Sequence, residues 1–304
     1  MALPSVMMLP TLIVLAAGIY YIYNEILQYL SKSTVKNKVV VITDAVSGVG
    51  TECARLFHQG GARLILCGTS WDKMESLYDT LTNGADPTVT FPPKLVLLDF
   101  TDMDSMPEVV TEVVECYGCV DVLVCNSSMK LKAPVHSISL ELDRNIMDVN
   151  YFGPSTLAKG VLPAMISRRS GHILLVNSIH GRLAVPFRTS YSASKHAAQA
   201  FFDCLRAEVE EFGILVSTIS HTFINATPPS TPPAPPQKGL PTYGVQPVIL
   251  ANEIVRTVNR KNREVLLAHP IPRIALYVHS FFPSLFFAVV AAGVKDTAMA
   301  EQML

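Results

Sequence analysis

The sequence carries no excess of charge of either sign. Its 304 residues include 24 Lys and Arg against 25 Asp and Glu, which gives a net charge of −1. Binding to nucleic-acid phosphates needs concentrated basic charge, so we expect no nucleic-acid partner. Charged residues form only 16% of the chain while 49% is hydrophobic. Much of this apolar content lies near the two ends of the chain.

The sequence also lacks a disulfide framework and a set of metal ligands. Cys116 and Cys119 have the spacing of a redox or zinc pair, but no second Cys or His pair lies nearby. We interpret the six cysteines as ordinary reduced thiols and expect no metal site. They lie in apolar or helical stretches, at positions 53, 67, 116, 119, 125 and 204.

No charged side chain precedes Glu25. The apolar run Val6–Tyr23 is close to the minimum length that spans a bilayer. Two interpretations are open: a retained signal anchor over residues 1–30, or a cleaved signal peptide with a luminal or secreted domain. We favour the anchor, because a positive n-region is missing and tyrosines end the run. Lysines follow at 32, 36 and 38, which predicts a cytosolic main domain.

Between residues 36 and 269, strand and helix signals alternate. Short apolar runs are typical of strands buried on both faces of a parallel sheet. We therefore expect an α/β, doubly wound, Rossmann-like domain that binds its ligand at the carboxyl ends of the strands. The expected strands are 38–43, 64–67, 94–98, 120–125, 171–177 and 215–220. The expected helices are 48–59, 71–82, 106–116, 139–166 (bent near Gly153 and Pro154) and 191–212.

Two segments interrupt this alternation. Thr227–Pro241 is proline-rich, so it is neither helix nor inner strand; a lid and a plain surface loop are both open. In the extension 270–304, Ala275–Gly293 is strongly apolar. Its length fits a second membrane contact, a buried core helix or the contact of a homodimer.

A glycine-rich turn follows the first expected strand. Glycines there let the backbone approach a pyrophosphate, and the N-terminus of the next helix presents free N–H groups to it. The position predicts dinucleotide binding by Thr43, Ser47, Gly48, Val49 and Gly50.

Polar side chains end two further strands. Asp99 follows the third strand, where its carboxylate would accept the adenine amino group or cap the next helix, as Asp102 also would. Asn126 follows the fourth strand, where an amide knits neighbouring strands beside a cofactor or makes a turn.

The most informative set is Ser178, Tyr191 and Lys195. Ser178 ends a strand, and Tyr191 and Lys195 share one helix face four residues apart. A free phenol, with a pKa of about 10, accepts an alcohol proton poorly at neutral pH. A nearby ammonium and a cationic nicotinamide ring favour the phenolate. The serine would hold the substrate oxygen while the cofactor exchanges a hydride with the substrate carbon.

These motifs, in this order and spacing, resemble the short-chain dehydrogenase/reductase family over about residues 36–269. The resemblance implies an NAD(P)-dependent oxidoreductase with catalytic Ser178, Tyr191 and Lys195. It also implies that Asn150 anchors a water relay to the lysine, and that Thr222 lies where the family walls the nicotinamide. Tyr191 and Lys195 would contact the cofactor as well.

Several stretches resemble the reticulum-membrane branch called dehydrogenase/reductase member 7, among them Tyr151–Pro154 and Ser194–Ala197. This closer resemblance implies an endoplasmic or sarcoplasmic reticulum location. It also implies lipophilic alcohol or carbonyl substrates, retinol-like or steroid-like, that partition into membrane lipid.

The chain departs from the family pattern around the cofactor. Asp44 replaces a loop glycine, His221 replaces a proline, and residues 68–70 (Gly-Thr-Ser) offer neither an acid nor a base as cofactor selector. The absence of a cation for a 2′-phosphate favours NAD, with NADP left open. With Cys125 and Ser128, these departures also raise an alternative, a weakly active or inactive nucleotide-sensing scaffold that regulates a reticulum membrane partner.

Overall fold

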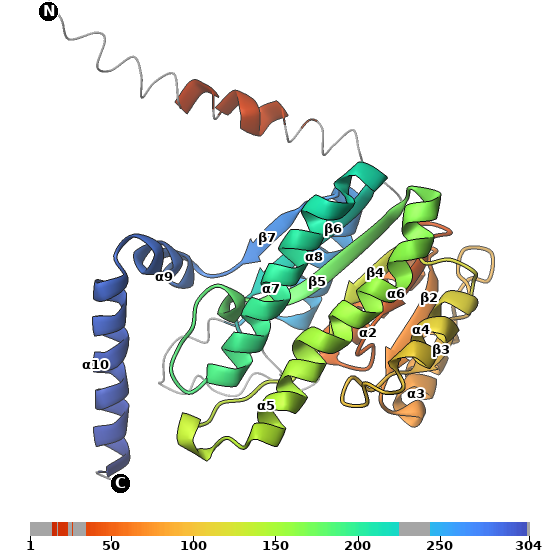
Figure 1. The fold of residues 1–304 in the computed structure, drawn as a ribbon. Helices are drawn as coiled ribbons and strands as arrows, with labels where there is room; N and C mark the ends of the chain where they lie inside the picture. Colours follow the sequence, from red (N-terminus) through yellow and green to blue (C-terminus); the bar gives the residue numbers. More distant parts are fainter. Residues whose placement is uncertain (1–13, 17, 24–25, 27–34, 225–243, 303–304) are drawn as a thin grey trace, which may run out of the picture.

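A seven-stranded parallel sheet forms the centre of the molecule (Figure 1). The computed structural model describes residues 14–16, 18–23, 26, 35–224 and 244–302. The strand order is β3-β2-β1-β4-β5-β6-β7, so the connections change direction between β1 and β4 and open a crevice at their carboxyl ends. The strands are β1 Val39–Ile42, β2 Arg63–Gly68, β3 Lys94–Leu97, β4 Val122–Cys125, β5 Gly171–Ser178, β6 Ile214–His221 and β7 Glu264–Leu267.

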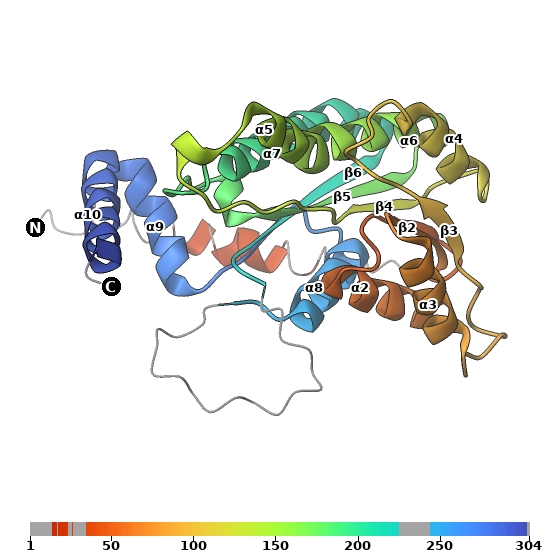
Figure 2. The same cartoon turned by 90° about the horizontal axis from the view of Figure 1, so that it is seen from below.

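Helices cover both faces of the sheet, as the alternating pattern predicted (Figure 2). One face packs against α4 (Met106–Glu115), α6 (Gly153–Arg168) and α7 (Thr189–Val209), the other against α2 (Gly48–Gln59), α3 (Trp71–Thr82) and α8 (Pro247–Arg260). The inner strands are buried on both sides; all four residues of β1 are at most 3% exposed. Two apolar cores therefore hold the carboxyl ends of the strands in fixed positions.

The helix expected at 139–166 is divided in three. It comprises α5 (Leu140–Met147), a π-helical turn at Asp148–Phe152 and α6. The bend expected at Gly153 and Pro154 is made by the π turn just before them, because one extra residue per turn re-aims the helix. Asn150 lies inside this turn.

Helix α8 and edge strand β7 were not among the expected elements. The sequence held a signal for α8, since its buried residues Leu250, Ala251, Ile254 and Val258 recur at helical spacing. Strand β7 has only four residues, none fully buried, so its pattern is too short to stand out.

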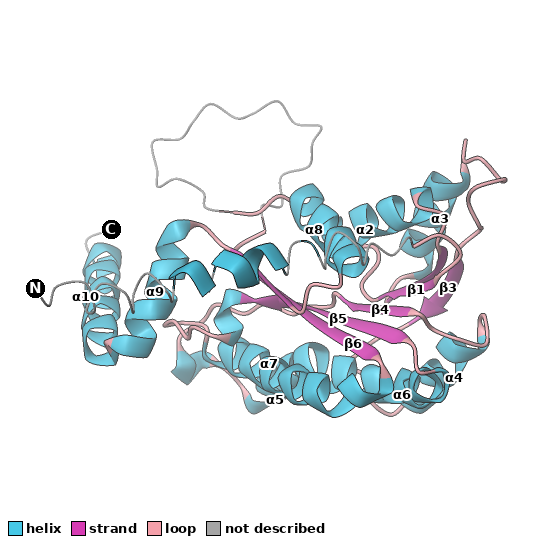
Figure 3. Cartoon of the chain, turned by 90° about the horizontal axis from the view of Figure 1, so that it is seen from above, coloured by secondary structure: helices cyan, strands magenta, loops and turns pink. Residues whose placement is uncertain are grey.

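Beyond β7, helices α9 (Pro270–Phe281) and α10 (Pro283–Gln302) pack on each other and project from the domain at the carboxyl end of the sheet (Figures 1 and 3). The interpretation as a buried core helix is wrong, because most of their large apolar side chains face solvent. The exposed ones are Ile271, Ile274, Tyr277, Phe281, Phe282, Leu285, Phe287 and Val289, at 55–72%.

Most of the predicted anchor, residues 1–30, and the proline-rich segment Thr227–Pro241 lie outside the described residues. Residues 14–16, 18–23 and 26 are helical, with apolar side chains more than half exposed. Within the described part of the chain, no helix joins the length and the apolarity that crossing a bilayer requires.

Candidate functional site

The catalytic candidates meet at the carboxyl edge of the sheet. Ser178 is the last residue of β5, and Tyr191 and Lys195 lie in the first two turns of α7. All three are at most 3% exposed. The Lys195 ammonium nitrogen lies 5.9 Å from the centroid of the Tyr191 ring, so the i, i+4 spacing brings the pair together as expected. The Ser178 hydroxyl accepts a hydrogen bond from the backbone N–H of His180 at 3.2 Å.

Asn150 joins two segments of this site. Its side-chain amide donates to the Met129 carbonyl (2.8 Å) and the Ser194 hydroxyl (2.9 Å), and its oxygen accepts from the Met129 N–H (2.8 Å). The fully buried side chain thereby ties the chain after β4 to the helix that carries Lys195. Both backbone groups of Met129 are paired by Asn150, so losing this side chain would cost two hydrogen bonds beside the site.

The glycine-rich turn is built around Ser47, the N-cap of α2. Its hydroxyl accepts from the Gly50 N–H (3.1 Å) and donates to the Asp44 carbonyl (2.8 Å). Val49 is buried in the first turn of α2. A Cβ at Gly50 would lie 2.2 Å from the Asp44 oxygen, so only glycine permits this approach. Gly48 begins the helix and leaves its N-terminal N–H groups at the crevice.

Thr43 and Asn126 join β1 to β4 at the point where the connections reverse. The Thr43 hydroxyl accepts from the backbone N–H groups of Asn126 (2.9 Å) and Ser127 (3.1 Å). The Asn126 amide donates to the Ser47 hydroxyl (3.0 Å) and to the carbonyls of Thr43 and Asp44 (3.3 Å each). Both side chains therefore shape the turn that would cradle a pyrophosphate.

Lys195 carries a buried side chain whose nitrogen has no hydrogen-bonding or ion-pairing partner among the described residues. Burial, together with the charge of Lys130 and partly offset by Cys125, lowers its pKa to about 7. A buried cation without acceptors is costly, so it fits a group that brings hydroxyls, such as a nucleotide ribose. With the Gly50 cradle, this donor set fits a dinucleotide.

The scan against family models matches residues 38–233 to the short chain dehydrogenase family. The chain belongs to this family. It is 66% identical, over the full length of both chains, to dehydrogenase/reductase SDR family member 7C-A of Danio rerio. It is 55% identical to member 7C of Homo sapiens, over 97% of each chain. The closer resemblance to the member 7 branch is therefore confirmed.

Solved structures confirm the fold of the family. A metagenomic short-chain oxidoreductase in complex with NADP covers 77% of this chain and 98% of its own, with a TM-score of 0.64 and 23% identity. An alcohol dehydrogenase from Thermococcus sibiricus, complexed with 5-hydroxy-NADP, covers 77% and 97%, with a TM-score of 0.66 and 23% identity. Each of these two relatives was solved with a dinucleotide bound.

The family's loop glycine is replaced by a strained, partly buried acid. Asp44 has φ +49°, in the left-handed region. Burial raises the pKa of its carboxyl, and a hydrogen bond with Ser47 opposes that rise. The carboxyl is therefore partly desolvated rather than freely solvated, and it lies in the turn that the cofactor phosphates would approach.

Asp99 and Thr222, the remaining predicted cofactor residues, also lie at the carboxyl edge of the sheet. Asp99 accepts from the N–H (2.9 Å) and the hydroxyl (2.8 Å) of Thr101. Neither Asp99 nor Asp102 caps the next helix, since Ser105 is the N-cap of α4. Buried Thr222 follows β6, and its N–H donates to the Leu267 carbonyl (3.2 Å).

Two histidines also lie at the site: His180, which the sequence reasoning did not assign to it, and His221, which the sequence had marked as a departure from the family pattern. The ring of His180 packs edge-on against Tyr191 at 5.7 Å between centroids, and its backbone holds Ser178. His221 pairs with Ser178 across β5 and β6. Burial, with smaller contributions from Lys195, Lys130 and His180, lowers the pKa of His221 to about 4, so it is neutral at physiological pH. Within the described residues, no cluster of side chains suits a metal ion.

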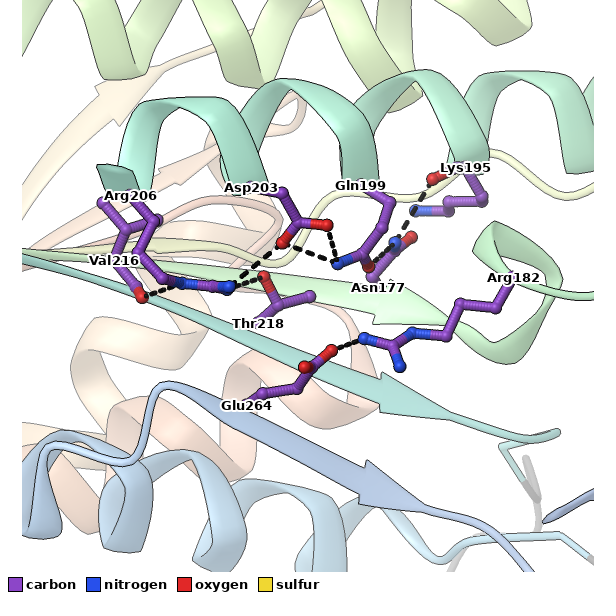
Figure 4. Close-up of polar contacts among 9 residues, drawn as sticks. All are labelled: Asn177, Arg182, Lys195, Gln199, Asp203, Arg206, Val216, Thr218 and Glu264. Carbon is purple, nitrogen blue, oxygen red and sulfur yellow. Dashed lines mark hydrogen bonds and ion pairs between the residues drawn. The ribbon is translucent and has the colours of Figure 1, made fainter. Parts of the chain in front are cut away.

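A chain of polar contacts, buried at Asn177 and Gln199 and reaching the surface at Asp203, holds the catalytic helix against the sheet (Figure 4). Asn177 donates to the Lys195 carbonyl (3.2 Å) and to Gln199 (2.9 Å), and Gln199 donates to both carboxylate oxygens of Asp203 (3.1 and 3.0 Å). Arg206 continues the chain from Asp203 to the Val216 carbonyl and the Thr218 hydroxyl. These contacts fix the position of α7 along the sheet, and therefore the position of Lys195.

Replacing Gln199 with alanine is expected to lower the free energy of unfolding by about 1–3 kcal/mol, because it removes a largely buried side chain that accepts a hydrogen bond from the fully buried Asn177 amide. Denaturant unfolding followed by circular dichroism measures the change. Glu208→Ala, on an exposed position of the same helix, is the control and should shift stability by less than about 0.5 kcal/mol. Equal stability of the two variants would show that Gln199 does not brace α7.

Proposed function

We propose that this family member interconverts a lipophilic alcohol and its carbonyl compound with a nicotinamide cofactor, in the manner of a retinol or steroid dehydrogenase. The observation that carries the proposal is the buried group of Ser178, Tyr191, Lys195 and Asn150 at the carboxyl edge of the sheet. We favour NAD, because Gly68, Thr69 and Ser70 supply no cation for a 2′-phosphate.

Each residue of this group has a separate role in holding the substrate, moving the proton or positioning its neighbours. The Ser178 hydroxyl holds the substrate oxygen, and the Tyr191 hydroxyl accepts the alcohol proton, or returns it to the carbonyl oxygen in the reverse direction. The Lys195 side chain lies beside the Tyr191 ring and offers donors to ribose hydroxyls. Asn150, through its hydrogen bond to Ser194, fixes the position of the helical turn that carries Lys195. When bound, the nicotinamide supplies or accepts the hydride.

Turnover by the full-length protein in detergent tests this proposal. Retinol and a steroid alcohol are offered with NAD and with NADP, and the reduced cofactor is followed by absorbance. We expect turnover with at least one of the two alcohols, faster with NAD. No turnover with either cofactor would contradict the proposal.

Asp44 and His221 favour a second function, a nucleotide-sensing scaffold with little or no activity that regulates a reticulum membrane partner. Both replace family residues beside the cofactor, while the acid–base groups are intact. Calorimetric titration with NAD(H) and NADP(H) separates the possibilities. Binding without turnover supports the sensor, and absence of binding supports a scaffold that does not use a nucleotide.

We further propose that α9 and α10 lie against a lipid bilayer of the reticulum, with the domain on the cytosolic side. Their exposed apolar side chains form a surface too large for a solvated monomer. This hairpin lies at the same end of the sheet as Ser178 and His221. A lipophilic substrate dissolved in the bilayer would therefore reach the site over a short path.

The single tryptophan of the chain allows this contact to be measured. In a Trp71→Phe background, Tyr277→Trp reports on α9 in the full-length protein reconstituted into phosphatidylcholine vesicles. We expect brominated lipid to quench fluorescence at position 277 strongly and at Trp71 of the wild type only weakly. Equal, weak quenching would contradict the bilayer contact. A blue shift at 277 that grows with protein concentration would instead indicate a homodimer.

A further inference from the structure

Two cations flank the catalytic tyrosine. Arg188 directly precedes α7, and its guanidinium carbon lies 6.0 Å from the centroid of the Tyr191 ring and 5.1 Å from that of Phe223. Lys130 directly follows Met129, whose backbone is held by Asn150. Both therefore come from segments that the structure fixes beside the site, one after β4 and one before α7.

The charges of Arg188 and Lys130 lower the pKa values of other basic groups in the site. The charge of Arg188 lowers the pKa of Lys130, after burial, and contributes to the lowered pKa of His180. The charge of Lys130 acts in the same direction on Lys195 and His221. With the Arg188 guanidinium placed beside the Tyr191 and Phe223 rings, and with Lys130 next to the Asn150-held Met129, these charges make the site electropositive.

No carboxylate of the described chain neutralises the pair. Neither Lys130 nor Arg188 takes part in an ion pair with a described residue. Asp143 approaches this region through the hydroxyl of Ser190 but forms no ion pair with Arg188.

We propose that the site takes an alcohol or carbonyl compound that carries an anionic group a few bonds from the reacting carbon. This inference rests on the proposed oxidoreductase function and narrows its substrate class to amphipathic acids. Arg188 would form a paired, charge-assisted contact with a carboxylate, sulfate or phosphate, and Lys130 would add attraction from the β4 side. The rings of Phe223 and His180, 6.2 Å apart, supply the apolar wall.

The acid takes no part in the reaction. In the reducing direction the carbonyl carbon gains a hydride, which the reduced nicotinamide supplies, and the oxygen gains the proton of the Tyr191 hydroxyl. The anionic group stays unchanged and serves only to orient the substrate. The Arg188 guanidinium carbon lies 6.0 Å from the centre of the Tyr191 ring, so a substrate anion bound there would lie beside the phenol, with a short linker to the reacting carbon.

The matched pair β-benzoylpropionate and its methyl ester tests the inference, since the two aryl ketones share the reacting group and differ in charge and by one methyl group. We expect the full-length protein in detergent to reduce the acid with a kcat/KM about tenfold above that of the ester. Arg188→Gln should abolish that preference, and Arg188→Lys should restore part of it. Lys73→Gln, on an exposed position of α3, is the matched control and should leave the acid-to-ester ratio unchanged.

Calorimetric binding of the two ketones to the protein saturated with cofactor gives a readout that does not need turnover. An acid-to-ester preference that is absent in the wild type, or unchanged in Arg188→Gln, overturns the inference even in an active enzyme. Preferential, Arg188-dependent binding without reduction upholds the anion site and contradicts the oxidoreductase function instead. Replacing carboxylate by the corresponding sulfonate and phosphonate ketones then distinguishes the kinds of acid.

Discussion

Replacing Tyr191 with phenylalanine is expected to lower kcat/KM by about 10³-fold or more, because it removes only the hydroxyl that exchanges a proton with the substrate oxygen. The ring remains and keeps its edge-on contact with His180. The residue is almost fully buried, so no other phenol of the described chain can take its place. Steady-state turnover of the full-length protein in detergent measures the loss.

Tyr117→Phe is the matched control. Its hydroxyl makes only a long bond, 3.4 Å, to the Pro92 carbonyl, far from the carboxyl edge of the sheet, so turnover should stay within about twofold of the wild type. Cofactor affinity should also survive Tyr191→Phe within about threefold, since Lys195 and the glycine-rich turn are unaltered. Retention of more than about a tenth of wild-type turnover would place the acid–base chemistry elsewhere.

Replacing Asp44 with glycine is expected to strengthen cofactor binding about tenfold at neutral pH and to raise the free energy of unfolding by about 1 kcal/mol. The affinity rises because a carboxylate beside the cofactor pyrophosphate is removed. Stability rises because glycine adopts φ +49° without strain and because a partly desolvated acid is lost. The greater chain entropy of glycine in the unfolded state offsets part of that gain.

The pH dependence of stability and of cofactor affinity distinguishes the effect of the Asp44 charge from that of its backbone strain. Burial raises the pKa of Asp44 above 3.8, so the folded protein holds this proton more tightly than the unfolded chain does. The wild type therefore loses stability relative to Asp44→Gly as pH rises from about 3.8 through the folded pKa, and the difference is constant above it. Cofactor affinity of the wild type should weaken over the same range, as the carboxylate forms.

Asp44→Asn is the second variant of this test, because asparagine removes the charge but keeps a side chain at positive φ. It should reproduce the gain in cofactor affinity, measured by calorimetry, and little of the gain in stability, measured by denaturant unfolding. An unchanged Kd in both variants would show that the carboxyl turns away from the phosphates and that the departure from the family loop is harmless.

Much of the fold was predictable because its determinants are local. Buried parallel strands appear as short apolar runs, and helix boundaries appear as caps; the helices at 48–59 and 71–82 match α2 and α3 residue for residue. The π turn at Asp148–Phe152 was harder to predict from the sequence, because its residues are compatible with an ordinary helical turn. It is stabilised by contacts of Asn150 with Met129 and Ser194, which are distant in the chain. The short edge strand β7 left too little pattern for prediction.

The sequence by itself determined the parallel α/β domain, the glycine-rich turn and the approach of Tyr191 to Lys195, since strand patterning, tight turns and one-turn helix spacing depend on neighbouring residues. Only the tertiary structure decided the electrostatics of the site. Lys130, Arg188 and His221 lie on three separate segments; the charge of Arg188 acts on Lys130, and that of Lys130 on the neutral His221, because folding brings these segments to one partly dehydrated space. Tertiary packing likewise left α9 and α10 exposed, since the sheet faces are already covered by other helices.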